Sequence, residues 1–572
     1  MRQSSLLFRP LLLGVFLTAL APSLHAALPD GGTIRRNIGD KIEKVPDTKP
    51  IAPLAPPDTT QHILSTSTLK VQVKSFIFSG VTLFSREVLA AQLSSLTQKE
   101  LSFVELQEAA RKIANFYAAH GYLAQALIPV QDIRDGVVNV KVIEARLGSV
   151  EVERAKGVRF SRERTAGFIT AGQPSGKVIR LRDLESGLML LQDMPGIQSS
   201  ALIRPGTAPS TVDAIVTLEG RPLFSGNAGY DNFGGVATGE HRMNAGLNLN
   251  SPLSLGDRLS LKSIYSDGMN YGRALYTLPL GNRGLRAGLS ASALTYRLGD
   301  KFASLEATGS SFTAGTFLSK PLRLSRRSTL YGSIGYDYRN FIDKVFSTRS
   351  GDKSLRSGNL SLSGSWYDDM FRGGYTAGSA TVSIGSLDLS KLPDVEQQDL
   401  AGPQAAGGYQ KLNLSLSRTQ QLIPGKLLFN LNMAAQLASC NLDSSEKFNL
   451  GGPDGVRAYS TTEGSGDEGM VISAELHETI RPAVQLFGFF DYGLIRQQVK
   501  TWDGWASNPG VPNTYSLNGV GIGMLLRPIE RFSLKTSLAT RLSHNPVADS
   551  EGRDHDGTKR TPRFWLEAVC EF

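Results

Sequence analysis

The part of the chain from about Leu223 to the C-terminus repeats one pattern that leaves few possible folds. About sixteen segments of roughly ten residues alternate apolar and polar side chains and are separated by turn residues. Alternation with a period of two is typical of β-strands. An even number of such strands is typical of outer-membrane barrels, which must close because lipid offers no hydrogen bonds to a free strand edge. We therefore predict that residues 223–572 form an all-β, 16-stranded antiparallel transmembrane barrel.

The composition agrees with this prediction and disfavours other classes. Glycine is frequent, at 59 of 572 residues, against about 7% in average proteins. The chain lacks the several apolar runs of about 20 residues that a helical membrane protein needs. Its net charge of +9 is spread without a basic cluster, so nucleic-acid binding is not expected. Two cysteines make neither a disulfide framework nor a zinc site, and we predict no metal and no cofactor.

Residues 1–26 are typical of a secretory signal peptide. Arg2 and Arg9 give a positive start, Leu11–Ala21 is an apolar run of the usual length, and small residues follow at the expected cleavage site. The run is too short to span a membrane comfortably. The sequence therefore predicts export.

Residues 67–147 and 148–222 form two modules, each of which contains both helical and strand-like spacing of apolar residues. In the first, apolar residues between 101 and 120 recur at helical spacing, Gly121 ends the helix, and an alternating hairpin follows. The second repeats this order, with leucines at helical spacing from Leu181 to Leu191 and a closing hairpin. We predict an α+β part of two small domains before the barrel.

The first module resembles a POTRA domain, and more narrowly the first POTRA domain of two-partner secretion transporters. The resemblance covers the segments YAAHGY (117–122), IPVQDI (128–133), the turn at Asp135-Gly136 and VIE (142–144). It implies a periplasmic binding module whose strand edges and grooves receive an unfolded client by strand addition. The residues it assigns to the client-binding region are Tyr117, Gly121, Tyr122, Pro129, Gln131 and Asp132.

A long loop, about residues 439–467, connects the predicted eleventh and twelfth strands. With a periplasmic N-terminus it is the sixth extracellular loop. Its segment LGGPDGVRAY (450–459) resembles the VRGY motif of the two-partner secretion and BamA superfamily, and FFDYG (489–493) resembles the F-x-D-x-G motif of its barrel wall. The resemblance implies that the loop folds into the lumen and that Arg457 pairs with Asp491.

The same resemblance assigns Gly451, Gly452, Gly455, Val456 and Tyr459 to the loop motif, and Phe489 and Gly493 to the wall motif. Alanine stands at position 458, where the family has glycine. Either the backbone there is ordinary, or Gly455 adopts the positive φ that alanine disfavours.

Both ends of the mature chain carry weaker signals. Phe572 ends an alternating strand and resembles the sorting signal of outer-membrane barrels. Residues 27–66 combine a polar stretch of weak helical rhythm with a segment of five prolines in twelve residues, 46–57, which predicts an extended linker. The polar stretch has a family counterpart that plugs the barrel, so we predict a possible plug helix and a linker.

Four functions are compatible with a barrel of this kind or have to be excluded for it. The first is a transporter of the TpsB type (ShlB/FhaC/HecB-like), which binds an unfolded β-helical exoprotein, such as a haemolysin or adhesin, and passes it across the outer membrane. The alternative is a BamA-like assembly factor, which usually carries more POTRA domains than 67–222 can hold. A passive porin would lack these domains. An enzyme is not expected, because the usual catalytic motifs are missing. Beside the exoprotein, the expected partners are outer-membrane lipid and the barrel-assembly machinery.

Overall fold

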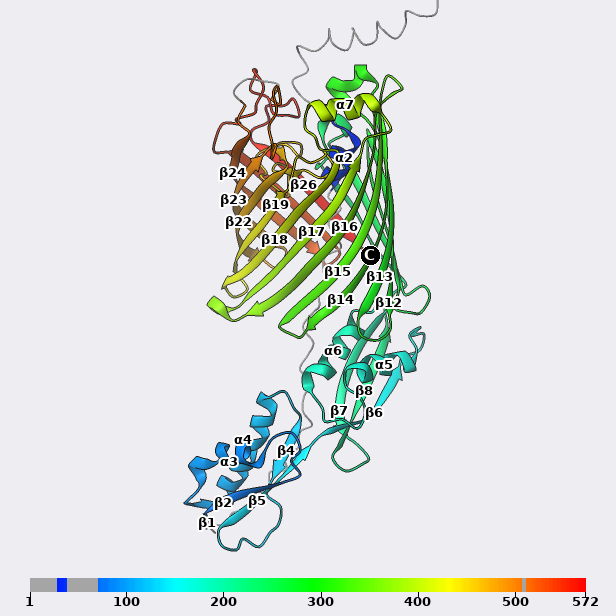
Figure 1. Ribbon diagram of the computed structural model, residues 1–572. Helices are drawn as coiled ribbons and strands as arrows, with labels where there is room; N and C mark the ends of the chain where they lie inside the picture. Colours follow the sequence, from blue (N-terminus) through cyan, green and yellow to red (C-terminus); the bar gives the residue numbers. More distant parts are fainter. Residues whose placement is uncertain (1–27, 39–69, 507–510) are drawn as a thin grey trace, which may run out of the picture.

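The computed structural model describes residues 28–38, 70–506 and 511–572. Two α+β domains lie one after the other below a large β-barrel (Figure 1). The predicted signal peptide and linker fall outside the described residues. Within these residues, no helix is both long enough and apolar enough to span a membrane.

The first domain packs two helices on a three-stranded sheet. Its strands β2 (Ser75–Ser79) and β5 (Val137–Glu144) are parallel, and β4 (Ala124–Leu127) runs antiparallel to β5. The long helix α4 (Phe103–Ala119) starts at a capping box between Ser102 and Glu105 and buries the apolar face that its spacing predicts. The remaining elements are β1 (Lys70–Val73), α3 (Arg86–Gln92), the short 3-10 helix Ser94–Leu96 and β3 (Lys99–Ser102).

The second domain has the sheet order β6-β8-β7, with β6 and β8 parallel. Its elements are β6 (Arg146–Arg154), α5 (Arg162–Gly172), α6 (Leu181–Gln192), β7 (Ile197–Pro205) and β8 (Thr211–Gly220). Helix α5 was not predicted, because its sequence RERTAGFITAG has no regular apolar face.

The barrel closes by pairing its last strand with its first. Sixteen strands form it, as predicted. They are β9 (Phe224–Asp231), β10 (Arg242–Asn250), β11 (Arg258–Ser266), β12 (Met269–Leu280), β13 (Leu285–Arg297), β14 (Thr308–Leu324), β15 (Ser328–Val345), β16 (Thr348–Asp368), β17 (Gly374–Asp388), β18 (Gly407–Ile423), β19 (Leu427–Ala438), β22 (Glu468–Arg481), β23 (Val484–Arg496), β24 (Thr514–Ile529), β25 (Phe532–Arg541) and β26 (Arg563–Glu571).

Smaller elements gather at the outer end of the barrel. Helix α7 (Pro393–Ala401) lies above the wall, and α2 (Gly31–Ile38) lies inside the ring of strands (Figure 1). The two-residue strands β20 (Phe448–Asn449) and β21 (Ser465–Gly466) pair within the loop between β19 and β22. Short 3-10 helices lie in the loops of this end at Val236–Thr238 and Asp300–Leu305, whereas a third, Met370–Arg372, lies in the turn between β16 and β17 at the opposite end.

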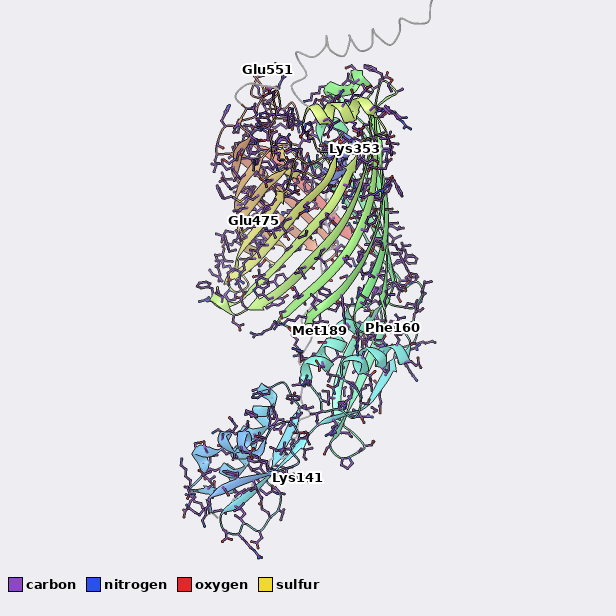
Figure 2. All side chains as sticks on the ribbon, in the orientation of Figure 1. Lys141, Phe160, Met189, Lys353, Glu475 and Glu551 are labelled. Atoms are coloured by element: carbon purple, nitrogen blue, oxygen red, sulfur yellow. The ribbon has the colours of Figure 1, made fainter. Side chains whose placement is uncertain are left out.

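The second domain is docked on the turns at the lower end of the barrel (Figure 1). Arg326 forms an ion pair with Glu185 of α6 at 2.6 Å, and Arg286 donates to the Asp193 carbonyl at 3.0 Å. Phe160 and Met189 lie at the same boundary (Figure 2). These contacts hold the domain under one side of the barrel, at β13 and at the turn between β14 and β15 (Figure 1).

Candidate functional site

The loop of residues 439–467 folds back into the barrel and forms a small core there. Leu450, Val456 and Tyr459 are fully buried, and they pack with the buried Phe489 and Leu517 of the wall. The β20–β21 pair and hydrogen bonds of Leu450 and Gly451 with Gly464 and Glu463 close the loop on itself. A closed, buried loop can take one fixed position in the lumen.

Arg457 at the loop apex binds Asp491 of β23. Its Nε donates to Asp491 Oδ2 at 2.8 Å and its Nη2 to Oδ1 at 2.6 Å. The Arg457 backbone N–H donates to the same carboxylate at 3.1 Å. Arg457 is 4% exposed and Asp491 is 0% exposed. This two-pronged, charge-assisted contact is the strong form of an arginine–carboxylate pair.

A second carboxylate, which the sequence analysis did not identify, completes the contact. Arg457 Nη1 donates to Glu475 Oε1 of β22 at 2.5 Å, and Glu475 Oε2 lies 2.7 Å from His477 Nε2. Ser473 accepts from Arg457 Nη2 and donates to Asp491, both at 2.8 Å. The signal in the sequence was the alternation of Ser473, Glu475 and His477, which places all three on the lumen face. We call Arg457, Asp491, Glu475 and Ser473 the loop latch.

The two motifs pack around the latch. The Arg457 guanidinium lies over the Phe489 ring, 3.4 Å from its centre, a geometry that adds a cation–π attraction. A Cβ at Gly493 would lie 2.9 Å from Leu450 and 3.0 Å from Val456. Trp565 of the last strand donates to the Arg457 carbonyl at 2.8 Å.

The loop glycines serve close approach and, at Gly452 and Gly464, a positive φ. A Cβ at Gly451 would lie 2.0 Å from the Ser460 carbonyl oxygen, and one at Gly455 would lie 2.0 Å from that of Leu450. Positive φ occurs at Gly452 (+105°), so it is Gly452 rather than Gly455 that needs this angle. Ala458 is not among the residues of positive φ, which resolves the alternatives in favour of ordinary backbone there.

A second contact holds the loop from the extracellular side. Glu463 is buried and accepts from Asn545 Nδ2 at 2.9 Å and from the His555 backbone N–H at 2.8 Å. Both donors belong to the loop that joins β25 and β26. Burial, and then the negative charge of Asp554, raise the pKa of Glu463 to about 7.

Helix α2 is tied both to the wall and to the long loop. Lys353 of β16 bridges Asp30 at 2.5 Å and Asp443 of the loop at 2.7 Å (its place in the barrel is labelled in Figure 2). Arg36 donates to the Ser444 carbonyl at 2.8 Å and to Ser465 Oγ at 3.0 Å. The helix and the loop therefore occupy the lumen together.

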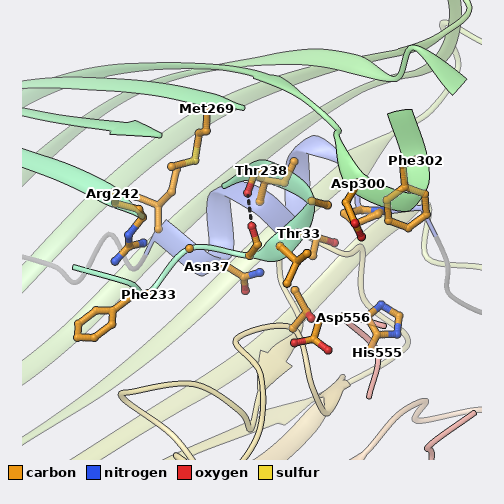
Figure 3. Close-up of a pocket in the computed structure, with 18 of the residues that line it drawn as sticks. Thr33, Asn37, Phe233, Thr238, Arg242, Met269, Asp300, Phe302, His555 and Asp556 are labelled. Atoms are coloured by element: carbon orange, nitrogen blue, oxygen red, sulfur yellow. Dashed lines mark hydrogen bonds between the residues drawn. The ribbon is translucent and has the colours of Figure 1, made fainter. Parts of the chain in front are cut away.

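A small pocket of about 50 Å³ remains beside α2. Thr33 and Asn37 of the helix, Phe302 of the wall loops, and His555 and Asp556 of the β25–β26 loop border it (Figure 3). Its size is that of a packing gap. Within the residues that the structure describes, no group of three or more metal-ligating side chains is assembled.

The residues assigned to the client-binding region do not form one surface. Tyr117 is fully buried and donates to Glu144 Oε1 at 2.9 Å; burial and this carboxylate raise its pKa. Gly121 and Tyr122 contact the second domain through the Leu181 backbone N–H and the Arg180 side chain. A fully buried Tyr117 cannot touch a client while the domain stays folded.

Three other residues of the assigned region stay on the surface. Gln131 pairs through its amide with the backbone of Asn139, at 2.8 and 2.9 Å. Asp132 forms an exposed ion pair with Arg134 at 2.7 Å, next to Pro129 and the exposed Val130. Their role with a client stays a prediction.

Phe572 closes the barrel seam at the periplasmic end. Its backbone N–H donates to the Gly226 carbonyl at 2.9 Å, and the Gly226 N–H donates back at the same distance. The ring is exposed toward the outside and lies against Gly226, where a Cβ would approach it to 2.7 Å. Its role as a sorting signal stays a prediction.

The fold and the site define a class: a 16-stranded outer-membrane barrel with two preceding POTRA domains and a loop folded into its lumen. The family model for the haemolysin secretion/activation proteins ShlB/FhaC/HecB matches residues 211–524, and the ShlB-type POTRA model matches residues 71–145. The chain belongs to the ShlB/FhaC/HecB family. It is thus an outer-membrane transporter of two-partner secretion with periplasmic POTRA domains, as predicted.

Known proteins agree with this assignment. The heme/hemopexin transporter protein HuxB of Haemophilus influenzae (strain 86-028NP) is 25% identical over 557 residues, which covers 95% of each chain. The outer membrane transporter CdiB of Escherichia coli is 24% identical over 453 residues, 76% of this chain and 72% of that one. The solved structure of CdiB from Escherichia coli has the same fold, with a TM-score of 0.70, 19% identity, and coverage of 91% and 94%.

Proposed function

We propose that the described structure is the closed, resting state of the transporter and that the loop latch and α2 hold it closed. The observation that carries this proposal is the shared network in the lumen. Lys353 joins α2 to the loop, and Arg457 joins the loop to the wall. An extended client can pass only after these contacts open.

The POTRA domains supply the client-binding surface in this proposal. Strand β7 lies at the edge of its sheet and pairs with β8 on one side. Its Gln198, Ser200 and Arg204 point outward together with the exposed Leu202. An unfolded exoprotein can add a strand there through main-chain hydrogen bonds, a mode that tolerates many client sequences.

Translocation in this proposal needs neither catalysis nor a cofactor. Folding of the client outside the cell supplies the direction, since buried surface keeps it from sliding back. Outer-membrane lipid surrounds the apolar wall, and the barrel-assembly machinery inserts the chain after recognition of Phe572. Of the named relatives, HuxB is a heme/hemopexin transporter protein and CdiB is an outer membrane transporter. The release experiment that closes the Discussion identifies the cargo of this chain.

Electrical conductance tests the resting state. The purified chain and a variant lacking residues 31–38 are inserted into planar lipid bilayers. We expect a small, mostly closed conductance for the intact chain and a larger, steadier one for the variant. Equal conductance would contradict the proposal that α2 closes the pore. A variant lacking the exposed loop residues Asp503 and Gly504 serves as a control for deletion itself.

A further inference from the structure

The two POTRA domains are joined by backbone hydrogen bonds around an isolated β-bridge between Tyr122 and Arg180, rather than by a loose connection. The Leu181 N–H donates to the Gly121 carbonyl at 3.0 Å, and the Leu123 N–H donates to the Ile179 carbonyl at 3.2 Å. The Ile179 N–H donates in turn to Ala145 at 2.8 Å. Leu123 also packs against the core of the second domain. The angle between the domains is therefore fixed by backbone pairing.

Side chains stiffen this joint. Arg180 donates from Nε to the Tyr122 hydroxyl at 3.1 Å, and its guanidinium lies 5.4 Å from the centre of the Tyr122 ring. The buried Gln173 accepts from the Arg180 backbone N–H at 3.0 Å and donates to the carbonyls of Lys177 and Val178 at 3.3 and 3.2 Å. Any groove beside the joint is thus preformed, which lowers the entropy cost of binding.

Such a groove exists beside the joint, with a volume of about 360 Å³. The first domain contributes Thr82, Leu83 and Tyr122, and the remaining lining residues come from the second domain and its first strand. Two backbone N–H groups, of Thr82 and Leu83, are held in place by Glu144 at 2.8 and 3.0 Å. Both walls of the groove are therefore rigid.

The charge of the groove is mostly positive. Arg146, Lys177 and Arg180 line it, against the single carboxylate of Asp183. Asp183 already lies 3.9 Å from Arg182, which is outside the lining. Lys177 is exposed, and its ammonium has no partner among the described residues. An anionic ligand would therefore meet uncompensated positive charge.

We infer that this groove, which we call the inter-POTRA groove, binds an acidic, extended segment of the unfolded exoprotein. The inference rests on the proposed function, which supplies an unfolded client in the periplasm. Carboxylates suit the arginine forks in geometry as well as charge, and positive charge along the path speeds encounter with the client. Tyr122 and Gly121 then act as positioning residues that shape the groove.

Peptide binding to the full-length chain in detergent tests the inference. The probe is a short fluorescein-labelled peptide of threonine, serine and valine with two aspartates, and its reference carries asparagines instead. We expect the aspartate peptide to bind about tenfold more tightly than the reference at low salt, and this preference to fade at high salt. Equal binding of the two peptides at low salt would overturn the inference.

Charge reversal locates the site. We expect Lys177→Glu to weaken binding of the aspartate peptide about tenfold, whereas Lys156→Glu, an exposed change on the same domain away from the groove, leaves it unchanged. Equal effects of the two variants would overturn the assignment of the site. If the Lys177→Glu variant binds the aspartate peptide like the wild type, while release of the exoprotein still requires this chain, the binding site is assigned wrongly and the proposed function stands. If the exoprotein is released equally well without this chain, the proposed function itself is refuted.

Discussion

Asp491→Asn is expected to lower the free energy needed to release the long loop from the wall by about 3 kcal/mol. The substitution removes the charge that Arg457 contacts at 2.6 and 2.8 Å and that its backbone contacts at 3.1 Å. Breaking a buried ion pair from one side costs about 3–5 kcal/mol. Glu475, at 2.5 Å from the guanidinium, retains part of the compensation, which places the cost near the lower end.

Arg457 itself reports the release, because trypsin cleaves after arginine. In the resting state the Arg457–Ala458 bond is buried and protected. A loss of about 3 kcal/mol raises the open fraction, and with it the cleavage rate, by about a hundredfold. The assay follows the fragments of the folded, detergent-solubilised barrel by mass spectrometry.

Two further variants frame this measurement. Asp503→Asn changes a residue on an exposed loop, and trypsin should cleave this variant at the wild-type rate. Trypsin should cleave the double variant Asp491→Asn, Glu475→Gln faster than either single variant. A barrel that keeps its heat-sensitive mobility on a gel confirms folding of each variant. If Asp491→Asn barrels are folded yet cleaved at the wild-type rate after Arg457, the ion pair does not hold the loop.

Three further predictions follow from other contacts. The pKa of Glu463 is raised from 4.5 to about 7, so its contribution to stability is complete below about pH 4.5 and is lost as the pH rises through about 7. Thermal midpoints should therefore fall over this pH range in the wild type and change less in Glu463→Gln. Lys353→Met leaves Asp30 and Asp443 without their shared cation, so amide hydrogen exchange of residues 31–38 should become faster. The exposed control Lys426→Gln should leave this exchange unchanged. Equal exchange rates in the two variants would contradict the role of Lys353 in holding α2. Tyr117→Phe removes a buried hydrogen bond to Glu144 and should destabilise the first domain by about 1–3 kcal/mol, read as earlier loss of its helical signal on heating; an unchanged midpoint would count against it.

The barrel was predictable because each strand repeats a period of two over many residues and because lipid enforces closure. The Arg457–Asp491 contact was predictable only through resemblance, since the two residues are distant in sequence. Glu475 escaped notice because a polar lumen face shows which side a residue occupies but not which partner it meets. The joint of Tyr122 with Arg180 escaped notice for the same reason.

The local errors have equally specific causes. Helix α5 forms without a regular apolar stripe, because its Phe168 and Ile169 reach the core from a mixed sequence. Tertiary packing supplies what the periodicity does not show. Tyr117 is part of the YAAHGY motif, but its side chain makes a buried hydrogen bond to Glu144 and does not contribute to the surface.

The most direct test of the account compares the proteins released into the culture medium by the parent strain and by a strain deleted for this gene, with mass spectrometry. The account predicts loss of one or a few large exoproteins, their return on expression of the chain, and unchanged levels of other outer-membrane barrels. A joint fall of many barrel proteins would contradict it in favour of an assembly factor. An unchanged medium, under conditions where a candidate exoprotein is produced inside the cell, would contradict transport altogether.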